Sequence, residues 1–123
     1  MEAVGPLQIR VLHHLWSHGP GTVGDVHSVL NAESERTGGR QLAYTTVLTV
    51  MRNLVRRNIL DQAPVGRAHR FTPLITKTEY QQAMMRQACV DLFSGDPREL
   101  VRSLTDDEQL AVDLRERLLI ALA

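Results

Sequence analysis

The sequence is poor in cysteine, in lysine and in aromatic residues. Among 123 residues it has one cysteine, Cys89, and aromatic residues make up 4%. A single cysteine excludes an intrachain disulfide framework and a cysteine-based metal cluster. No apolar run approaches the roughly 20 residues that a membrane-spanning helix needs, and the N-terminus lacks a signal-peptide pattern. We therefore expect a cytoplasmic protein that does not contact membranes.

Sequence motifs of enzymes are also missing. There is no glycine-rich phosphate loop, no nucleophile elbow and no metalloprotease helix motif. Cys89 falls in a segment with an apolar helical face, where a buried thiol is a commoner role than a nucleophile. We expect no enzyme activity, no catalytic residue and no cofactor, and a redox-responsive regulator stays open as an alternative.

The histidines raise the possibility of a metal site. All five lie within the first 69 residues, and His14 and His18 are four apart, so they would share one helix face as zinc ligands can. Nothing in the spacing fixes a third ligand. We expect no metal site, with a metal-responsive regulator kept as an alternative, and we expect His69 to pack within the fold.

The charge is balanced overall but unevenly distributed. Fourteen basic and fourteen acidic residues give a net charge of zero, yet residues 1–75 carry +3 and residues 76–123 carry −3. Within residues 40–70 there are six arginines against one acidic residue, Asp61. A basic segment in a neutral protein favours a localised anionic partner, although balanced surface pairing is an alternative. Arginine also suits phosphate and guanine contacts, but its excess over lysine equally suits a GC-rich genome.

Residues 1–75 show the order of a winged helix-turn-helix domain. Apolar periodicity predicts a helix over 7–18, a second one that Thr22 caps with Asp25 at the capping-box position, and a third over 43–57. The polar stretch 32–41 predicts a frayed helix end and a loop, and a two-stranded hairpin follows up to Pro73. The side chains expected to face inward are Leu7, Val11, Leu12, Leu15, Trp16, Val23, Val26, Val29, Leu30, Val47, Val50, Met51 and Leu54.

Residues 76–123 are predicted to be helical. A cap at Thr76 or Thr78 begins one helix, residues 94–97 break it, a short helix follows, and the pattern at 105–108 predicts the start of a final helix. A segment of this length cannot bury so many apolar positions alone, so packing on a second copy is expected. The expected dimerisation residues are Tyr80, Met84, Ala88, Leu92, Phe93, Leu110, Leu114 and Leu118, in a leucine series that continues to Leu122.

The third helix has an unusual outward face. Its sequence, AYTTVLTVMRNLVRR, is rich in Thr and Val, which are mediocre helix formers. In a helix-turn-helix protein the second helix of the motif lies in the major groove, where short hydroxyl side chains allow close approach and can bond to bases or phosphates. Tolerance of Thr and Val by tertiary packing is the structural alternative. The expected DNA contacts are Tyr44, Thr45, Thr46, Leu48, Thr49, Arg52, Arg56 and Arg57, with Arg67 at the tip of the wing.

AYTTVLTVMRNLVRRNIL followed by GRAHRFTP and preceded by LHHLWSHGPGTVGDVH resembles the bacterial penicillinase-repressor family of the BlaI/MecI type. The resemblance extends to DLFSGDPRELVRSLTDDEQL, which is similar to the dimerisation region of that family. It implies a homodimeric repressor that binds an inverted repeat in double-stranded DNA, often with TACA and TGTA halves. The contacts it implies fall on Thr45, Leu48, Thr49, Arg52 and Arg67.

Two features of the family are not recognisable here. Some members are cut by a sensor protease at an Asn-Phe bond, but the two phenylalanines of this chain follow Arg70 and Leu92. Copper-responsive relatives carry a C-terminal cysteine cluster, whereas this chain ends RLLIALA.

We expect a mainly α protein, with a DNA-binding domain over 1–75 and a helical dimerisation region over 76–123, whose inducing signal is open. A winged-helix module that binds protein and has no DNA affinity is the other alternative.

Overall fold

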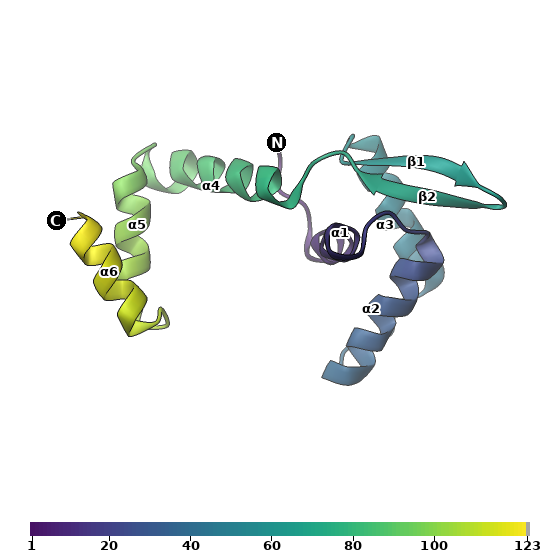
Figure 1. Cartoon of the computed structure of the whole chain (residues 1–123), viewed down its shortest axis with the longest axis horizontal. Helices are drawn as coiled ribbons and strands as arrows, with labels where there is room; N and C mark the ends of the chain where they lie inside the picture. The colour runs from purple at the N-terminus through teal and green to yellow at the C-terminus, as the bar shows by residue number, and fades with distance from the viewer. Residues whose placement is uncertain (123) are drawn as a thin grey trace. The chain divides into compact units, whose positions relative to one another are not determined.

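The computed structural model describes residues 1–122, which form six helices and one two-stranded sheet (Figure 1). It consists of two compact units, Glu2–Tyr80, which we call the winged unit, and Gln81–Ala123, which we call the C-terminal unit. The predicted fold class, a winged helix with a β wing and C-terminal helices, is confirmed. The elements are α1 (Pro6–His18), α2 (Val23–Thr37), α3 (Tyr44–Arg56), β1 (Leu60–Val65), β2 (Ala68–Pro73), α4 (Lys77–Phe93), α5 (Pro97–Thr105) and α6 (Val112–Leu122).

The core of the winged unit lies between its three helices and the base of the wing. Most side chains predicted to face inward are buried there, whereas Leu7, Trp16, Val29 and Val50 are half-buried. The wing contributes Phe71, which is 1% exposed and which helical periodicity cannot find. The buried apolar residues are Val11, Leu12, Leu15, Val23, Val26, Leu30, Val47, Met51, Leu54, Ile59, Leu60 and Phe71.

Helix α2 begins as predicted and ends within the predicted stretch 32–41. The Asp25 amide donates to Thr22 Oγ1 at 3.2 Å and the Thr22 amide donates to Asp25 Oδ2 at 3.0 Å, which completes the capping box. The helix end and loop predicted over 32–41 are both present, and the structure places the boundary at Thr37, the last residue of the helix. Ser34 is buried on the inner face of this extension, and Gly38 ends the helix with a left-handed backbone at φ 74°.

The wing is an antiparallel ribbon held at its base by a third segment. Gln62 pairs with Phe71 and Pro64 with His69, and Gly66 makes the tip with φ 62°. At the base, Phe71 exchanges two backbone hydrogen bonds with Gly21, of 2.8 and 3.1 Å. A two-stranded hairpin alone is marginally stable in water, so the bridge to Gly21 and the burial of Phe71 fix the wing to the helices.

The first turn of α4 belongs to the winged unit. Thr76 caps it, since the Glu79 amide donates to Thr76 Oγ1 at 3.1 Å. Tyr80 is 8% exposed, its hydroxyl accepts from the Val4 amide at 3.1 Å, and its ring lies 5.7 Å from that of Trp16. Trp16 in turn donates to the Ile75 carbonyl at 2.9 Å. Tyr80 is therefore occupied by contacts within the winged unit and has little surface left for a partner chain.

The C-terminal unit departs from the prediction at Thr105. This residue does not cap the final helix but ends α5, because its hydroxyl donates back to the Arg102 carbonyl at 2.7 Å and its side chain is buried. Helix α6 begins only at Val112. The predicted leucine series ends at Leu122. The side chain of Leu122 and the whole of Ala123 lie outside the described residues.

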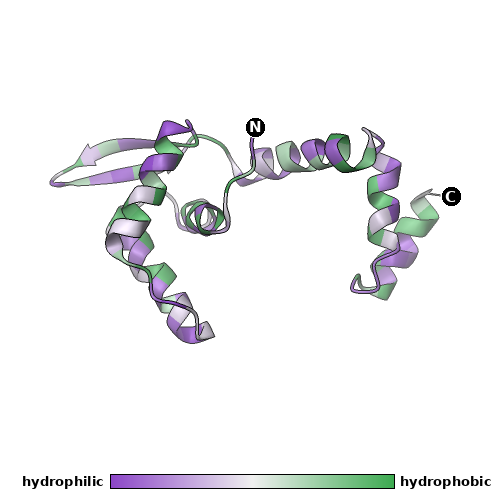
Figure 2. Cartoon of the chain, turned by 180° about the vertical axis from the view of Figure 1, so that it is seen from behind, coloured by the Kyte–Doolittle hydropathy of each residue, from purple (hydrophilic) through white to green (hydrophobic). Residues whose placement is uncertain are grey.

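Exposed apolar side chains gather on the C-terminal unit. Figure 2 shows hydrophobic segments along α4, α5 and α6. Leu92 is 73% exposed, a high value for a large aliphatic side chain. The exposed large apolar residues of this unit are Met85, Val90, Leu92, Leu104, Val112, Leu114, Leu119 and Ile120. Among the described residues, no helix has the length and apolar character needed to cross a membrane.

His14 is a buried polar residue in the largely apolar interior of the winged unit. It is 9% exposed, its Nδ1 has no hydrogen-bond partner in the described part of the chain, and its ring stacks on that of His18 with centroids 4.6 Å apart. Burial and the nearby His18 lower the pKa of His14 below 6.5, against weaker opposing effects of Asp25 and Glu33. Within residues 1–122, no group of three or more His, Cys, Asp or Glu side chains is arranged to hold a metal ion.

The stability of the winged unit is expected to fall as the pH drops below about 6.5. Unfolded His14 takes up a proton near that pH, whereas folded His14 resists it, so the unfolded state binds more protons and is favoured. Urea unfolding followed by circular dichroism, repeated between neutral and mildly acidic pH, measures how steeply the free energy of unfolding falls with pH. We call this the pH slope. His14→Gln should reduce it, and His13→Gln, at an exposed neighbouring site, should not. An unchanged slope in His14→Gln would assign the effect to other groups.

Candidate nucleic-acid interface

The two faces of α3 differ sharply in exposure. Val47, Met51 and Leu54 are fully buried, so the helix is fixed by its inner face. Thr45, Thr49 and Arg52 are all exposed on the opposite face. The Thr49 hydroxyl donates to the Thr45 carbonyl at 2.9 Å, which satisfies its proton and leaves its oxygen free to accept. The structure thus brings together three of the residues that the sequence predicts as DNA contacts.

The N-terminal turn of α3 is open to an anion. Ala43 precedes the helix with no side-chain cap, and the Thr46 and Val47 amides donate to its carbonyl at 3.1 and 3.3 Å, which leaves the N–H groups of Tyr44 and Thr45 without an intrahelical acceptor. These groups and the positive end of the helix dipole favour a phosphate. Tyr44 is 50% exposed beside this turn, with its ring 5.8 Å from that of His27, and Thr46 is exposed.

The predicted arginine contacts lie in different surroundings. Arg52 and Arg67 are exposed. Arg56 Nη1 donates to Asn53 Oδ1 at 2.8 Å, so its guanidinium lies along its own helix. Arg57 Nη2 donates to the Glu2 carbonyl at 2.9 Å, which ties it to the N-terminal segment. Contact with a phosphate by Arg57 would require this bond to be shared or broken.

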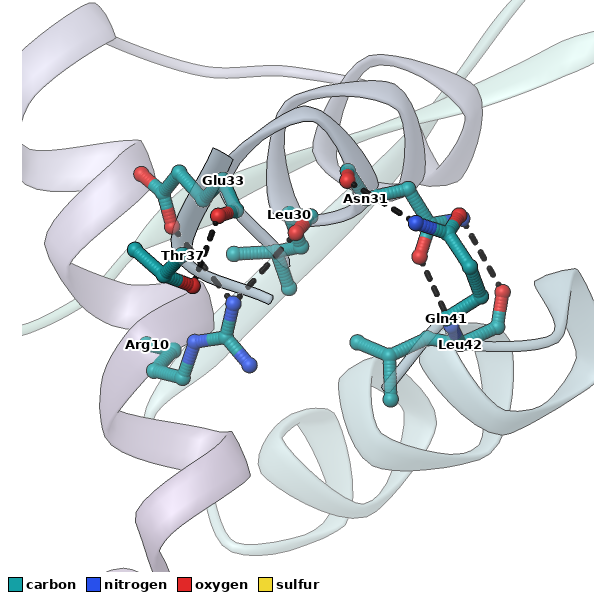
Figure 3. A network of polar contacts seen from close by, with 7 residues as sticks. All are labelled: Arg10, Leu30, Asn31, Glu33, Thr37, Gln41 and Leu42. Atoms are coloured by element: carbon teal, nitrogen blue, oxygen red, sulfur yellow. Dashed lines mark hydrogen bonds and ion pairs between the residues drawn. The ribbon is translucent and has the colours of Figure 1, made fainter. Parts of the chain in front are cut away.

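The start of α3 is clamped to α2 through the backbone of Leu42, which the sequence analysis missed (Figure 3). Asn31 Oδ1 accepts from the Leu42 amide at 2.7 Å, and Asn31 Nδ2 lies 3.0 Å from the Leu42 carbonyl. His27 Nε2 lies 2.9 Å from the same carbonyl. On the other side of α2, Arg10 bonds to the Leu30 carbonyl at 3.4 Å and forms an ion pair with Glu33 at 3.5 Å. The contacts to Leu42 fix the start of α3 against α2, and those of Arg10 fix α2 against α1.

A hollow of about 620 Å³ lies between α3, the wing and the start of α2, and we call it the wing hollow. Arg52 and Arg67 line it from two elements, and Leu48 lines it while also packing against the core. His69, which was predicted to pack within the fold, is instead exposed and lines the hollow together with Gln62. Its lining is Thr22, Val23, Gly24, Tyr44, Leu48, Arg52, Gln62, Arg67, Ala68, His69 and Phe71.

A three-helix unit with an exposed Thr- and Arg-bearing third helix and a basic β wing belongs to the winged helix-turn-helix class of regulators. The sequence profile described as "Penicillinase repressor" matches residues 4–123. The chain is also 35% identical over 100 residues to "Transcriptional regulator BlaI" from two strains of Mycobacterium tuberculosis, CDC 1551 / Oshkosh and H37Rv. Each alignment covers 80% of this chain and 68% of the relative.

The chain therefore belongs to the penicillinase repressor family, as the resemblance of its motifs predicts. The family consists of transcriptional regulators and not of enzymes, so this membership confirms the prediction that the chain is not an enzyme.

Proposed function

We propose that the chain is a homodimeric transcriptional repressor that occupies an inverted-repeat operator in a promoter. In this proposal residues 1–75 bind DNA and residues 76–123 form the dimer. Two copies of α3 related by a two-fold axis would enter successive major grooves roughly 34–36 Å apart. The observation that carries the proposal is the exposed face of α3, where Thr45, Thr49 and Arg52 stand opposite a fully buried apolar face.

The chemistry of each side chain decides whether we assign it to bases or to phosphates. Thr45, Thr49 and Arg52 would read bases, because hydroxyl and guanidinium groups match the donor and acceptor pattern of the major groove. Leu48 would touch a thymine methyl group. The remaining predicted contacts, Tyr44, Thr46, Arg56, Arg57 and Arg67, would hold the register of the protein through phosphates.

The exposed apolar surface of the C-terminal unit supports the dimer. Contiguous apolar patches on soluble proteins usually mark interaction sites, and symmetric dimers are the commonest assembly that buries them. A groove of about 490 Å³ in this unit is lined by Met85, Cys89, Val90, Leu100 and Val101 among others. Because Tyr80 is buried in the winged unit, we leave it out of the interface. In the proposed set, Leu92 and Leu114 are exposed in the single chain. The set is completed by residues that are half-buried there, namely Met84, Ala88, Phe93, Leu110 and Leu118.

The proposal is tested by fluorescence-anisotropy titration of a duplex with a TACA…TGTA inverted repeat and of a scrambled duplex, at several salt concentrations. We expect the repeat to bind more tightly by orders of magnitude, with a log–log salt slope of about −0.9 per phosphate contact. If the repeat shows no preference, selection from random duplexes would identify a diverged operator. Weak binding to every duplex, with little salt dependence, would instead support a protein-binding module.

Replacing Arg52 and Arg67 separately should have different effects. Arg52→Ala is expected to reduce the preference for operator over scrambled DNA by about 5- to 150-fold, since a bidentate base contact is worth about 1–3 kcal/mol of discrimination. Arg67→Ala should weaken both duplexes alike and lower the salt slope by about one contact. The same anisotropy titrations measure both effects. Identical behaviour of the two variants would contradict the assignment of base reading to α3 and phosphate binding to the wing.

A further inference from the structure

Gln62 and His69 lie on the side of the wing that faces α3. Directly opposed residues of an antiparallel pair share one face, and residues two apart on a strand share it as well. Gln62 is opposed to Phe71, and His69 is two residues before Phe71 on the same strand. Since Phe71 is buried against the helices, this is the inner face of the ribbon. Gln62 and His69 lie beyond the core on that face, where they are exposed and line the wing hollow.

The walls of the wing hollow are held in place by contacts within the protein. The bridge between Gly21 and Phe71 fixes β2 against the connection between α1 and α2. Buried Val23 and Phe71 both line the hollow. Because its shape rests on buried side chains and backbone hydrogen bonds, a ligand that enters it does not have to order the surrounding segments.

The chemistry of the lining is that of a phosphate site. Arg52 and Arg67 both line the hollow, and none of its lining residues, all of them within the described part of the chain, is acidic. The Gln62 amide and the His69 ring can each donate a hydrogen bond to an anionic oxygen. Among the described residues, neither side chain has a hydrogen bond to another protein group, so their donors are available.

We propose that one sugar-phosphate strand of the operator lies in the wing hollow, and that Gln62 and His69 donate hydrogen bonds to its phosphates. This inference rests on the proposed function. If α3 occupies a major groove and Arg67 at the wing tip binds phosphates beyond the edge of that groove, the strand that forms the edge must pass between helix and wing. The wing then holds DNA along its inner face and not by its tip alone.

The test compares Gln62→Ala/His69→Ala with the wild type and with Thr72→Ala. Thr72 is also exposed on β2, but it alternates with Phe71 and so lies on the outer face of the ribbon. We expect the double variant to lose about 10- to 100-fold in affinity for operator and scrambled DNA alike. Its salt slope should match that of the wild type, because no arginine or lysine is removed. Thr72→Ala should bind as the wild type does.

Gln62→Glu is a second test variant, in which the size of the side chain is kept and a negative charge is added. Its carboxylate would repel a phosphate, so we expect a larger loss than for Gln62→Ala. Unfolding transitions like those of the wild type would show that both variants fold. Wild-type affinity in the double variant would overturn the inference while leaving the proposed function intact, as would a loss confined to operator DNA. A wild-type chain that does not bind DNA would overturn both.

Discussion

Replacing Phe71 with alanine is expected to destabilise the winged unit by about 3–5 kcal/mol, the usual cost of removing a fully buried phenylalanine side chain. Phe71 is 1% exposed and is the residue through which the wing enters the core. Small domains have a total stability of about 5–15 kcal/mol, so the variant should be close to unfolding at room temperature. The wing should lose its attachment before the helices lose theirs.

Urea unfolding followed by circular dichroism measures this effect. Thr72→Ala, one residue away on the exposed face of the same strand, is the matched control and should change the unfolding free energy by less than about 0.5 kcal/mol. A Phe71→Ala variant with nearly wild-type stability would mean that the helices fold independently of the wing. Loss of DNA binding with retained helicity would then show that the wing is needed for the interface only.

The second large effect concerns the C-terminal unit. Leu92→Glu/Leu114→Glu is expected to convert the proposed dimer to a monomer, because two carboxylates would have to be buried without partners. Both leucines are exposed in the single chain, so folding of the protomer should not require them to be apolar. Operator affinity should fall by about 10²- to 10⁴-fold, since the second half-site would no longer be bound at high effective concentration.

Sedimentation velocity measures the assembly state, and anisotropy measures the affinity. Gln109→Glu adds a carboxylate at an exposed polar position of the same unit and should stay dimeric. A double variant that remains dimeric would move the interface to another surface. A monomer that binds the operator as tightly as the wild type would instead remove dimerisation from the recognition mechanism.

Helical periodicity predicted the core of the winged unit well because burial repeats along each helix. It placed Val11, Leu12, Val47 and Met51 correctly, and the sequence predicted the capping box of α2 from Thr22. These features are local, and each is set by residues within a turn or two of the chain. The exposed polar face of α3 follows from the same periodicity.

The structure refines or corrects the sequence-based predictions at three places. Polar composition predicted a frayed helix end and a loop over 32–41 without a boundary, and burial of Ser34 and the glycine cap place that boundary at Thr37. Residues 105–108 match the sequence pattern of a capping box, which predicts that Thr105 begins the final helix. In the structure the Thr105 hydroxyl instead donates to the Arg102 carbonyl within α5. Tyr80 has the spacing of a dimer residue, but in the single chain it is buried and contacts Val4 and Trp16, which are distant in the sequence.

The wing hollow was also beyond prediction from the sequence. The register of the ribbon, which places Gln62 and His69 on the inner face, is visible only once Phe71 is known to be buried. The clamp of Asn31 on Leu42 uses backbone atoms, which leave no trace in side-chain patterns. Strand alternation from a known buried aromatic is the signal that would have found Gln62 and His69.

The bridge between Gly21 and Phe71 has a consequence for the order of folding. It joins segments that are far apart in the chain, so it can form only after the intervening helices have collapsed. The ribbon beyond it has few apolar contacts, and a hairpin of two strands is marginal alone. We therefore expect the three helices to fold first and the wing last. In native-state hydrogen exchange, the amides near Gly66 should exchange before those of α3, through local openings that leave the helices intact.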